Sequence, residues 1–286
     1  MALPSPIVAG WELVLRLRER REQVGVEVKD ITKALGFSRN YWSAIENERK
    51  ILSDEALRKL LKLLDYKPDE EREMLALREI AKDHGWWTYY SALFDAELRR
   101  FFGLEHGAHT IRLYENLLIP GLLQTPDYAR AVIHPFVTVP RVQVGQRVEV
   151  RLERQKRLDD DDPLHLTAVI SEAALHQQIG GVKVLRAQLE HLIKMIEKYS
   201  DTLHVHVMPF AADAYSLFGS ATIYLIDFEN PRLPTVVWQE TVTAWGVIDD
   251  RLQVEAISTA FDEAEQRALD KQGSRNLVEQ RIKELS

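Results

Sequence analysis

The chain has 286 residues, 45% of them hydrophobic, and its 37 Lys and Arg against 44 Asp and Glu give a net charge of −7. This length suffices for two domains, and the absence of cysteine excludes disulfides, Cys-ligated zinc and thiol catalysis. The opening MALPSPIVAGW lacks the basic and apolar segments of a secretory signal, and no apolar run approaches the ~20 residues that span a bilayer. We therefore expect a cytoplasmic protein without membrane contact.

Residues 1–66 have the pattern of a helical bundle. Residues 11–24 predict a first helix, and Ser53 is placed to cap a later one whose leucines lie on one face. Between them, residues 27–47 predict two short helices joined by a turn at Gly36, a residue that tolerates positive φ. The sequence therefore predicts an all-α domain of four or five helices.

The two short helices have the layout of a helix-turn-helix. Ile31 and Leu35 form the apolar face of the first helix, and Ser38 can cap the second, in which Trp42 and Ile45 point inward. The side chains left outward are those of Arg39, Asn40, Ser43 and Ala44. Arg and Asn on such a helix can pair bidentately with base edges in the DNA major groove. An ordinary helical hairpin is the alternative, and the pattern alone does not separate the two.

The charge of this segment bears on that choice. Residues 1–66 hold twelve Lys and Arg against ten Asp and Glu, a net of +2, so the rest of the chain carries −9. A net of +2 is small for a lone DNA-binding module, because phosphate neutralisation supplies much of the affinity. Two copies double the number of phosphate contacts, so we expect a homodimer.

After residue 66 the pattern changes. Pro68 suits the first position of a helix that extends toward Gly85, and we interpret residues 67–85 as a connector. Aromatic residues then concentrate in residues 86–102. We interpret that stretch as a helix that docks on a large core, with a ligand cage as the alternative.

Residues 86–286 predict an α+β domain. An extended segment at 108–119 precedes a Pro-Gly turn, a short helix that Thr125 can cap, and an arginine-rich helix at 141–158. Four segments rich in β-branched and aromatic residues are expected as strands, at 164–171, 203–210, 220–228 and 235–241. Further helices are expected at 182–200, 249–270 and 274–285. The predicted fold is thus α+β overall, with an N-terminal all-α bundle and a larger domain with a small mixed sheet.

Several other residue groups resemble sites of metal binding or phosphate binding, but each has a simpler structural explanation. Consecutive carboxylates at Asp159–Asp162 cannot all converge on one metal ion, so a solvated loop is favoured. His204 and His206 alternate on a strand without a third metal ligand at a useful spacing. Gly180-Gly181 precedes a helix but lacks a phosphate-loop pattern. No catalytic signature is present, and we expect no enzyme, no cofactor and no metal.

The arginine-rich helix is a second candidate for nucleic-acid contact. Arg147, Arg151 and Arg154 share one face and are interleaved with Glu149 and Glu153. This mixture favours ion pairing or packing over direct contact with DNA.

Two parts of the chain resemble known families. Residues 1–66, with the segment SAIENERK, resemble the helix-turn-helix of XRE-type (Cro/repressor-like) regulators, where Ser-x-Ile-Glu-Asn-Gly-Arg is usual. The later part resembles a domain of unknown function that is fused to such modules in actinobacterial regulators of the WhiJ type. The segments that carry this likeness are LEHGAHTIRLYENLLIPGLLQTPDYARAVI, RVEVRLERQKRL, SEAALHQQIGG with VLRAQLEHLI, and VHVMPF.

The resemblance implies sequence-specific DNA binding by the N-terminal module, usually in a transcriptional regulator. It also implies pairing with a small protein encoded by a neighbouring gene, in pairs likened to toxin–antitoxin systems. Arg39, Asn40 and Ala44 hold positions that reach base edges in the family, and Arg49 and Lys50 hold phosphate-contact positions. The full set of candidate DNA contacts is Lys29, Lys33, Ser38, Arg39, Asn40, Ser43, Ala44, Arg49 and Lys50.

Three positions depart from the family pattern. Val28 stands where a Gln is common, and Ala44 stands where Arg, Lys or Gln is usual, which leaves only apolar contact to a thymine methyl. Glu48 replaces the usual Gly, so the turn there is expected to differ. Base reading should therefore be narrower than in a typical member and led by Arg39 and Asn40.

These observations predict a homodimeric transcriptional regulator that binds a pseudo-palindromic operator in double-stranded DNA, with half-sites ~34 Å apart. It would be nucleoid-associated when bound to DNA. The C-terminal domain would carry dimerisation or bind a small partner protein or an effector. The residues expected at the effector or partner site are Trp86, Trp87, Tyr90, Tyr114, Pro120 and Gln124. The alternative is an antitoxin-like interaction protein that mainly binds the neighbouring-gene protein, with DNA binding only autoregulatory.

Overall fold

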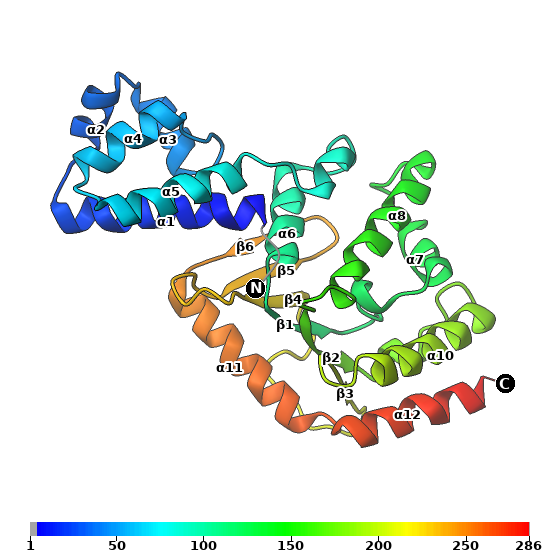
Figure 1. Ribbon diagram of the computed structural model, residues 1–286. Helices are drawn as coiled ribbons and strands as arrows, with labels where there is room; N and C mark the ends of the chain where they lie inside the picture. The colour runs from blue at the N-terminus through cyan, green and yellow to red at the C-terminus, as the bar shows by residue number, and fades with distance from the viewer. Residues whose placement is uncertain (1–4, 286) are drawn as a thin grey trace. The chain divides into compact units, whose positions relative to one another are not determined.

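The computed structural model describes residues 5–285. They form two compact units that meet in sequence at Tyr89 and Tyr90, and Figure 1 shows the elements of each. Along residues 5–285, no helix combines the length and the apolar character needed to cross a membrane.

The N-terminal unit is all helical, as predicted. Its core holds a cluster in which Leu57, Leu60 and Leu61 are buried together with Ile31 and Trp42. The helices are α1 (Pro6–Val24), α2 (Val28–Leu35), α3 (Arg39–Glu46), α4 (Asp54–Leu63) and α5 (Pro68–Ala81), followed by the 3-10 turn η1 (Trp86–Tyr90).

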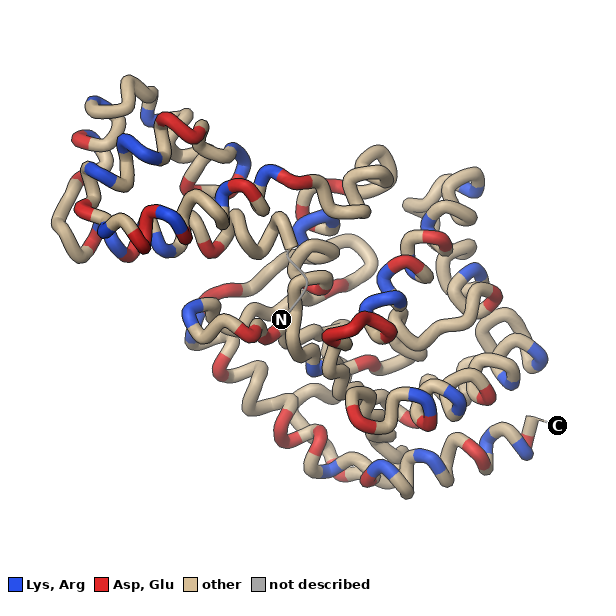
Figure 2. Tube along the Cα trace, in the orientation of Figure 1, with Lys and Arg blue, Asp and Glu red and all other residues tan. Residues whose placement is uncertain are grey.

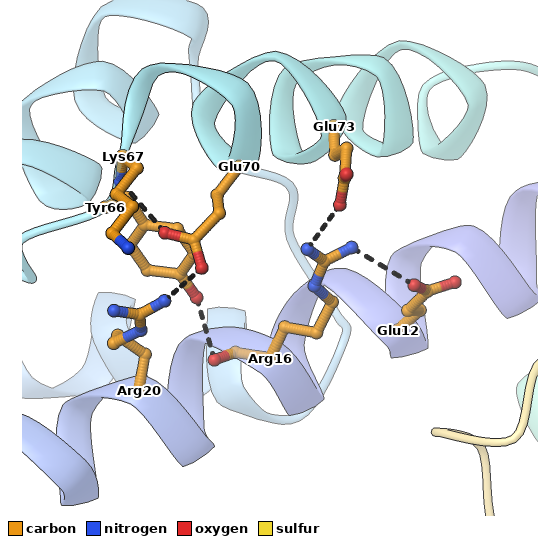
Figure 3. A network of polar contacts seen from close by, with 7 residues as sticks. All are labelled: Glu12, Arg16, Arg20, Tyr66, Lys67, Glu70 and Glu73. Atoms are coloured by element: carbon orange, nitrogen blue, oxygen red, sulfur yellow. Dashed lines mark hydrogen bonds and ion pairs between the residues drawn. The ribbon is translucent and has the colours of Figure 1, made fainter.

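Helix α5 is part of this unit, which corrects the interpretation of residues 67–85 as a connector. Its Met74 is fully buried in the same core cluster. Helix α5 is also held to α1 by polar contacts, shown in Figure 3: Arg16 Nη2 donates to Glu73 at 2.8 Å, and Arg20 pairs with Glu70. The hydroxyl of Tyr66 donates to the carbonyl of Arg16 at 2.9 Å. A helix with buried apolar and ion-paired faces packs as a bundle member rather than as a spacer.

The C-terminal unit is built on a six-stranded mixed sheet, which confirms the predicted α+β class. The strand order is β3-β2-β1-β4-β5-β6. Strands β1 and β2 pair in parallel, as do β2 and β3, whereas the other three pairs are antiparallel. The strands are β1 (Thr110–Glu115), β2 (His165–Ser171), β3 (Leu203–Met208), β4 (Thr222–Asp227), β5 (Val236–Glu240) and β6 (Trp245–Ile248).

Helices cover both faces of this sheet (Figure 1). On one face, Val237 of β5 packs in a buried cluster with Phe261 of α11. On the other face, Trp238 stacks on Phe101 of α6 with ring centroids 4.6 Å apart. The helices are α6 (Ala96–His106), α7 (Pro126–Ile133), α8 (Val144–Gln155), α9 (Ala173–His176), α10 (Val182–Lys198), α11 (Arg251–Arg267) and α12 (Lys271–Glu284), with 3-10 turns η2 (Gly121–Leu123), η3 (Arg141–Gln143) and η4 (Lys156–Leu158).

Two features of this unit differ from expectation. The aromatic stretch 86–102 is not one helix but holds η1 and the start of α6. Asp95 caps α6 by accepting a hydrogen bond from the backbone N–H of Leu98 at 2.8 Å. Strand β6 was not predicted, because four partly exposed residues give too short a pattern. Strand β6 is recognised in the structure by its antiparallel pairing with β5.

Candidate nucleic-acid interface

The turn between α2 and α3 has the geometry that its sequence dictates. Gly36 ends α2 in the left-handed region at φ +68°, where a side chain would be strained. Ser38 then caps α3 by accepting a hydrogen bond from the N–H of Tyr41 at 3.1 Å. These two residues set the angle at which α3 leaves α2.

Buried contacts fix the orientation of α3 within its unit. Trp42 and Ile45 are 4% and 3% exposed and lie in the same core cluster as Ile31 of α2. At its carboxyl end, the Glu46 carbonyl accepts a hydrogen bond from Arg18 Nη2 of α1 at 3.3 Å. Apolar burial and this cap hold one face of α3 inward, so the opposite face is presented rigidly.

The outward face of α3 carries the polar residues that the sequence placed there. Ser38, Arg39, Asn40 and Ser43 are exposed, and Ala44 is half-buried. Within residues 5–285, the side chains of Arg39 and Asn40 form no hydrogen bond or ion pair. The donors of the guanidinium and the donors and acceptor of the amide are therefore available to a ligand.

The other candidate contacts divide into free and engaged side chains. Lys33 and Arg49 are exposed and form no ion pair within the described part of the chain. Lys29 pairs with Glu27 at 2.7 Å, and Lys50 Nζ lies 4.7 Å from the centre of the Tyr41 ring. Lys33 and Arg49 therefore offer unpaired cationic side chains for the phosphate contacts that DNA binding needs.

Two residues that support α3 were missed by sequence reasoning. The Asn47 amide donates to the carbonyl of Ser43 at 2.7 Å and to its Oγ at 3.2 Å, so the Ser43 hydroxyl is already engaged. The spacing of four residues between them could have indicated this contact. The cap by Arg18 had no local signal, because Arg18 lies on another helix.

The turn after α3 corrects an expectation. Glu48 has φ +58°, and its N–H bonds to the Ile45 carbonyl while that of Arg49 bonds to the Ala44 carbonyl, at 2.9 and 2.8 Å. This is the Schellman ending that usually holds Gly. The turn therefore keeps the backbone of a Gly turn although Glu occupies it.

The arginines of α8 make hydrogen bonds within their own unit. Arg154 forms two parallel hydrogen bonds with Glu105, at 2.7 and 2.6 Å, and both side chains are less than 10% exposed. Arg151 donates to Gln124 at 2.6 Å, and Arg147 donates to the Leu93 carbonyl at 2.7 Å. This supports packing rather than DNA contact for the arginine-rich helix.

The six residues expected at an effector or partner site are distributed over both units. Trp86 and Trp87 lie in the N-terminal unit, with ring centroids 5.7 Å apart. In the C-terminal unit, the Tyr114 hydroxyl bonds to that of Tyr215 at 2.6 Å, on the sheet face that α11 covers. The other three are Tyr90, which opens this unit, and Pro120 and Gln124, which flank η2 and are buried. A binding role for this set stays a prediction.

The remaining titratable groups weighed in the sequence have local partners. Asp159 pairs with Lys198 at 2.6 Å, and His206 Nδ1 lies 3.0 Å from the Leu269 carbonyl oxygen. Burial lowers the pKa of His204. Over residues 5–285, no three His, Asp or Glu side chains are grouped so that they could hold a metal ion.

Helices α2 and α3 are joined by a tight turn, and α3 presents a polar face on which Arg39 and Asn40 have no partner within residues 5–285. This is the arrangement of a helix-turn-helix domain. Residues 12–75 match a family model described as a helix-turn-helix domain. Residues 98–280, more than half of the chain, match the family described as a domain of unknown function (DUF5753), and the chain belongs to that family. The resemblance drawn from the sequence is thereby confirmed. No curated protein and no solved structure matches the chain.

Proposed function

We propose that this protein is a sequence-specific DNA-binding transcriptional regulator whose helix α3 reads bases in the major groove. The observation that carries the proposal is the pair Arg39 and Asn40, exposed in the first turn of α3 and without partners within residues 5–285. In helix-turn-helix proteins the N-terminal residues of the second helix contact base edges. The match of residues 12–75 to helix-turn-helix domains supports this assignment.

Each side chain on this face has a role that fits its chemistry. Arg39 suits bidentate pairing with guanine, and Asn40 suits adenine. Ala44 is half-buried and can offer only apolar contact to a thymine methyl. The free cations of Lys33 and Arg49 suit phosphates, which position the protein without reading sequence.

The low charge of the first 66 residues, a net of +2, is the reason for proposing a homodimer on a pseudo-palindromic operator with half-sites ~34 Å apart. Doubling the phosphate contacts raises the electrostatic share of the affinity. The C-terminal unit would then carry dimerisation or bind the partner or effector that controls the regulator. Such a protein acts in the cytoplasm, where the chromosome lies.

A second candidate is an antitoxin-like interaction protein with only autoregulatory DNA binding. The net charge of −9 after residue 66 favours it, since an acidic surface attracts a basic partner. The two candidates differ in one measurement: DNA affinity of the protein alone supports the regulator, and affinity only in a complex with the neighbouring-gene protein supports the alternative.

The test is to select duplexes from a random library with the full chain, then measure binding to the selected and a scrambled duplex by fluorescence anisotropy. Arg39→Ala should remove about 1–3 kcal/mol of discrimination between the two duplexes. Arg186→Ala is the matched control: it removes the same charge from an exposed position of α10, where Arg186 pairs with Glu190. It should leave discrimination unchanged.

Equal losses for Arg39→Ala on both duplexes would reassign Arg39 to phosphate contact. Failure of the full chain to enrich any sequence would overturn the proposal. Sedimentation analysis with and without the selected duplex tests the homodimer separately.

A further inference from the structure

Strand β1 lies at the boundary between the parallel and the antiparallel part of the sheet. Its neighbour on one side, β2, is parallel and its neighbour on the other, β4, is antiparallel. In open α/β sheets, ligands bind at the carboxyl ends of the strands where the strand order reverses. In this chain that position is the end of β1, occupied by Glu115.

Side chains of three strands meet there on one face of the sheet. Tyr114 is paired with Ile223, which places Glu115 beside Thr222, and the Thr222 hydroxyl donates to Glu115 Oε2 at 3.1 Å. Thr222 is in turn paired with Glu240 of β5. Because side chains alternate along a strand, Tyr224 lies on this same face.

Helix α8 supplies a cation to that face. Tyr224 is paired with Trp238, whose ring stacks on Phe101, and the Arg154 guanidinium lies 5.2 Å from the Phe101 ring centre. Arg151 lies one turn before Arg154 on the same helix. Besides desolvation, the charge of Arg154 opposes the charged form of the Arg151 guanidinium and the carboxylate of Glu240 favours it, which is consistent with this placement.

Arg151 differs from its neighbour in having no counter-ion. Arg154 is neutralised by Glu105, whereas within residues 5–285 Arg151 forms no ion pair and one side-chain hydrogen bond, to Gln124. Its other guanidinium nitrogens are not among the enclosed polar atoms without a partner. Arg151 is half-buried, and desolvation lowers the pKa of its guanidinium.

Two more polar groups on this face have free bonding capacity. Tyr224 is 5% exposed, yet its hydroxyl has no hydrogen-bond partner within the described chain and is not enclosed. Glu115 is 7% exposed and uses only Oε2 toward Thr222. Burial raises the pKa of Glu115 to about 8, so near neutral pH its carboxyl is protonated and can donate a hydrogen bond.

The chemistry of these groups defines the ligand. An unpaired guanidinium beside hydroxyl donors selects an anion, and a planar carboxylate matches its paired donors. The carboxylate of Glu240 disfavours a dianion such as phosphate, because like charges repel. We propose that Arg151, together with Tyr224 and Glu115, binds the carboxylate of a small organic monocarboxylate at the carboxyl end of β1. This deepens the proposed function, on which it rests in one respect: the ligand would be the effector of the regulator.

The experiment uses the full chain without DNA, so that its result does not depend on DNA recognition. Acetate, hexanoate, benzoate and phenylacetate, their amides, and inorganic phosphate are tested at pH 7 by thermal unfolding, and binders are measured by calorimetry. At least one carboxylate should raise the Tm, and its amide should not. Arg151→Met should weaken binding at least tenfold, and Tyr224→Phe severalfold.

Arg147→Met is the matched control, since Arg147 lies on the same helix and donates only to uncharged groups, the Leu93 carbonyl and Gln143. It should bind the carboxylate within twofold of the unmodified chain. The inference is overturned if no carboxylate raises the Tm, if phosphate binds more tightly than every carboxylate, or if folded Arg151→Met retains full affinity. A carboxylate that binds in a chain without DNA affinity would contradict the proposed regulator and leave this site standing.

Discussion

Two arginines, Arg39 in the N-terminal unit and Arg154 in the C-terminal unit, are used in opposite ways. In the N-terminal unit, Arg39 is exposed on α3 and has no partner within residues 5–285. In the C-terminal unit, Arg154 is 9% exposed and is held by a buried carboxylate, Glu105. Arg39 is thus available for a ligand, whereas Arg154 is part of the core.

The comparison shows that a candidate DNA-binding surface is recognised by basic side chains without ion-pair partners rather than by the number of basic residues. The segment RVEVRLERQKR of α8 and η4 is richer in arginine than SRNYWSAIENERK around α3. Figure 2 shows acidic and basic residues interspersed along the helices of both units. A free guanidinium can bind phosphate or bases, whereas one already paired with a carboxylate would have to break that pair first.

The largest effect that would break this comparison is expected at Arg154. Arg154→Met leaves the Glu105 carboxylate buried without its partner, and we expect a loss of about 3–5 kcal/mol of unfolding free energy. Urea unfolding of the full chain followed by circular dichroism measures it. If Arg154 is structural, the double variant Arg154→Met with Glu105→Leu should recover most of that loss. A variant with unchanged stability would place Arg154 with the ligand-binding arginines instead.

The second effect concerns the pH dependence of the C-terminal unit. Burial raises the pKa of Glu115 from 4.5 to about 8. Between these values the folded chain holds a proton that the unfolded chain has lost, so Glu115 makes stability fall as pH rises from about 4.5 to about 8. Glu115→Gln should remove this dependence.

Unfolding curves at pH 5 and pH 8.5 provide the measurement. The advantage of Glu115→Gln over the unmodified chain should grow by on the order of 3 kcal/mol between these two pH values. Parallel changes in both proteins would show that Glu115 is ionised in the folded state.

A third effect separates phosphate-contacting from base-reading residues within the N-terminal unit. Arg49 is proposed to contact phosphate, so Arg49→Ala should weaken binding to selected and scrambled duplexes alike, by about 1 kcal/mol at 0.15 M salt, and reduce the salt slope by about 1. Anisotropy titrations over a salt series test this. A loss confined to the selected duplex would make Arg49 a base-reading residue.

The smallest expected effect is at Glu48, whose φ of +58° suits Gly better than Glu. Glu48→Gly should raise unfolding free energy by about 0.5–1 kcal/mol, as relief of backbone strain exceeds the extra entropy of the unfolded chain. Urea unfolding of this variant is compared with that of Glu48→Gln, which removes the charge but keeps the strain. A gain in both variants would assign the effect to charge.

The fold of the N-terminal unit could be predicted largely from local signals. Gly36 and Ser38 carry the turn and the cap within their own residues, and the spacing of Trp42 and Ile45 fixes the buried face of α3. These interactions span a few residues, which is why Arg39, Asn40 and Ser43 are exposed on α3 as expected, while Ala44 is half-buried. The role of α5 was missed because its packing depends on α1, far away in the sequence.

The C-terminal unit was less predictable because its decisive contacts are long-range. The partner of Arg154 is Glu105, 49 residues earlier, and no spacing rule connects them. That Arg151 has no counter-ion within residues 5–285 is visible only after the other arginines of α8 have been assigned their partners. Strand β6 likewise exists through β5, since residues 245–248 are too short to signal a strand alone.

The order of the strands has a consequence for synthesis on the ribosome. Strands β1 to β3 leave the exit tunnel before β4 and before α11, whose Phe261 covers the sheet in the finished unit. Until α11 follows, the apolar side of the nascent sheet has no cover, and exposed strands of this kind are prone to aggregate. Cotranslational folding of the C-terminal unit is therefore expected to finish late, and chains stopped before residue 251 should need chaperone protection.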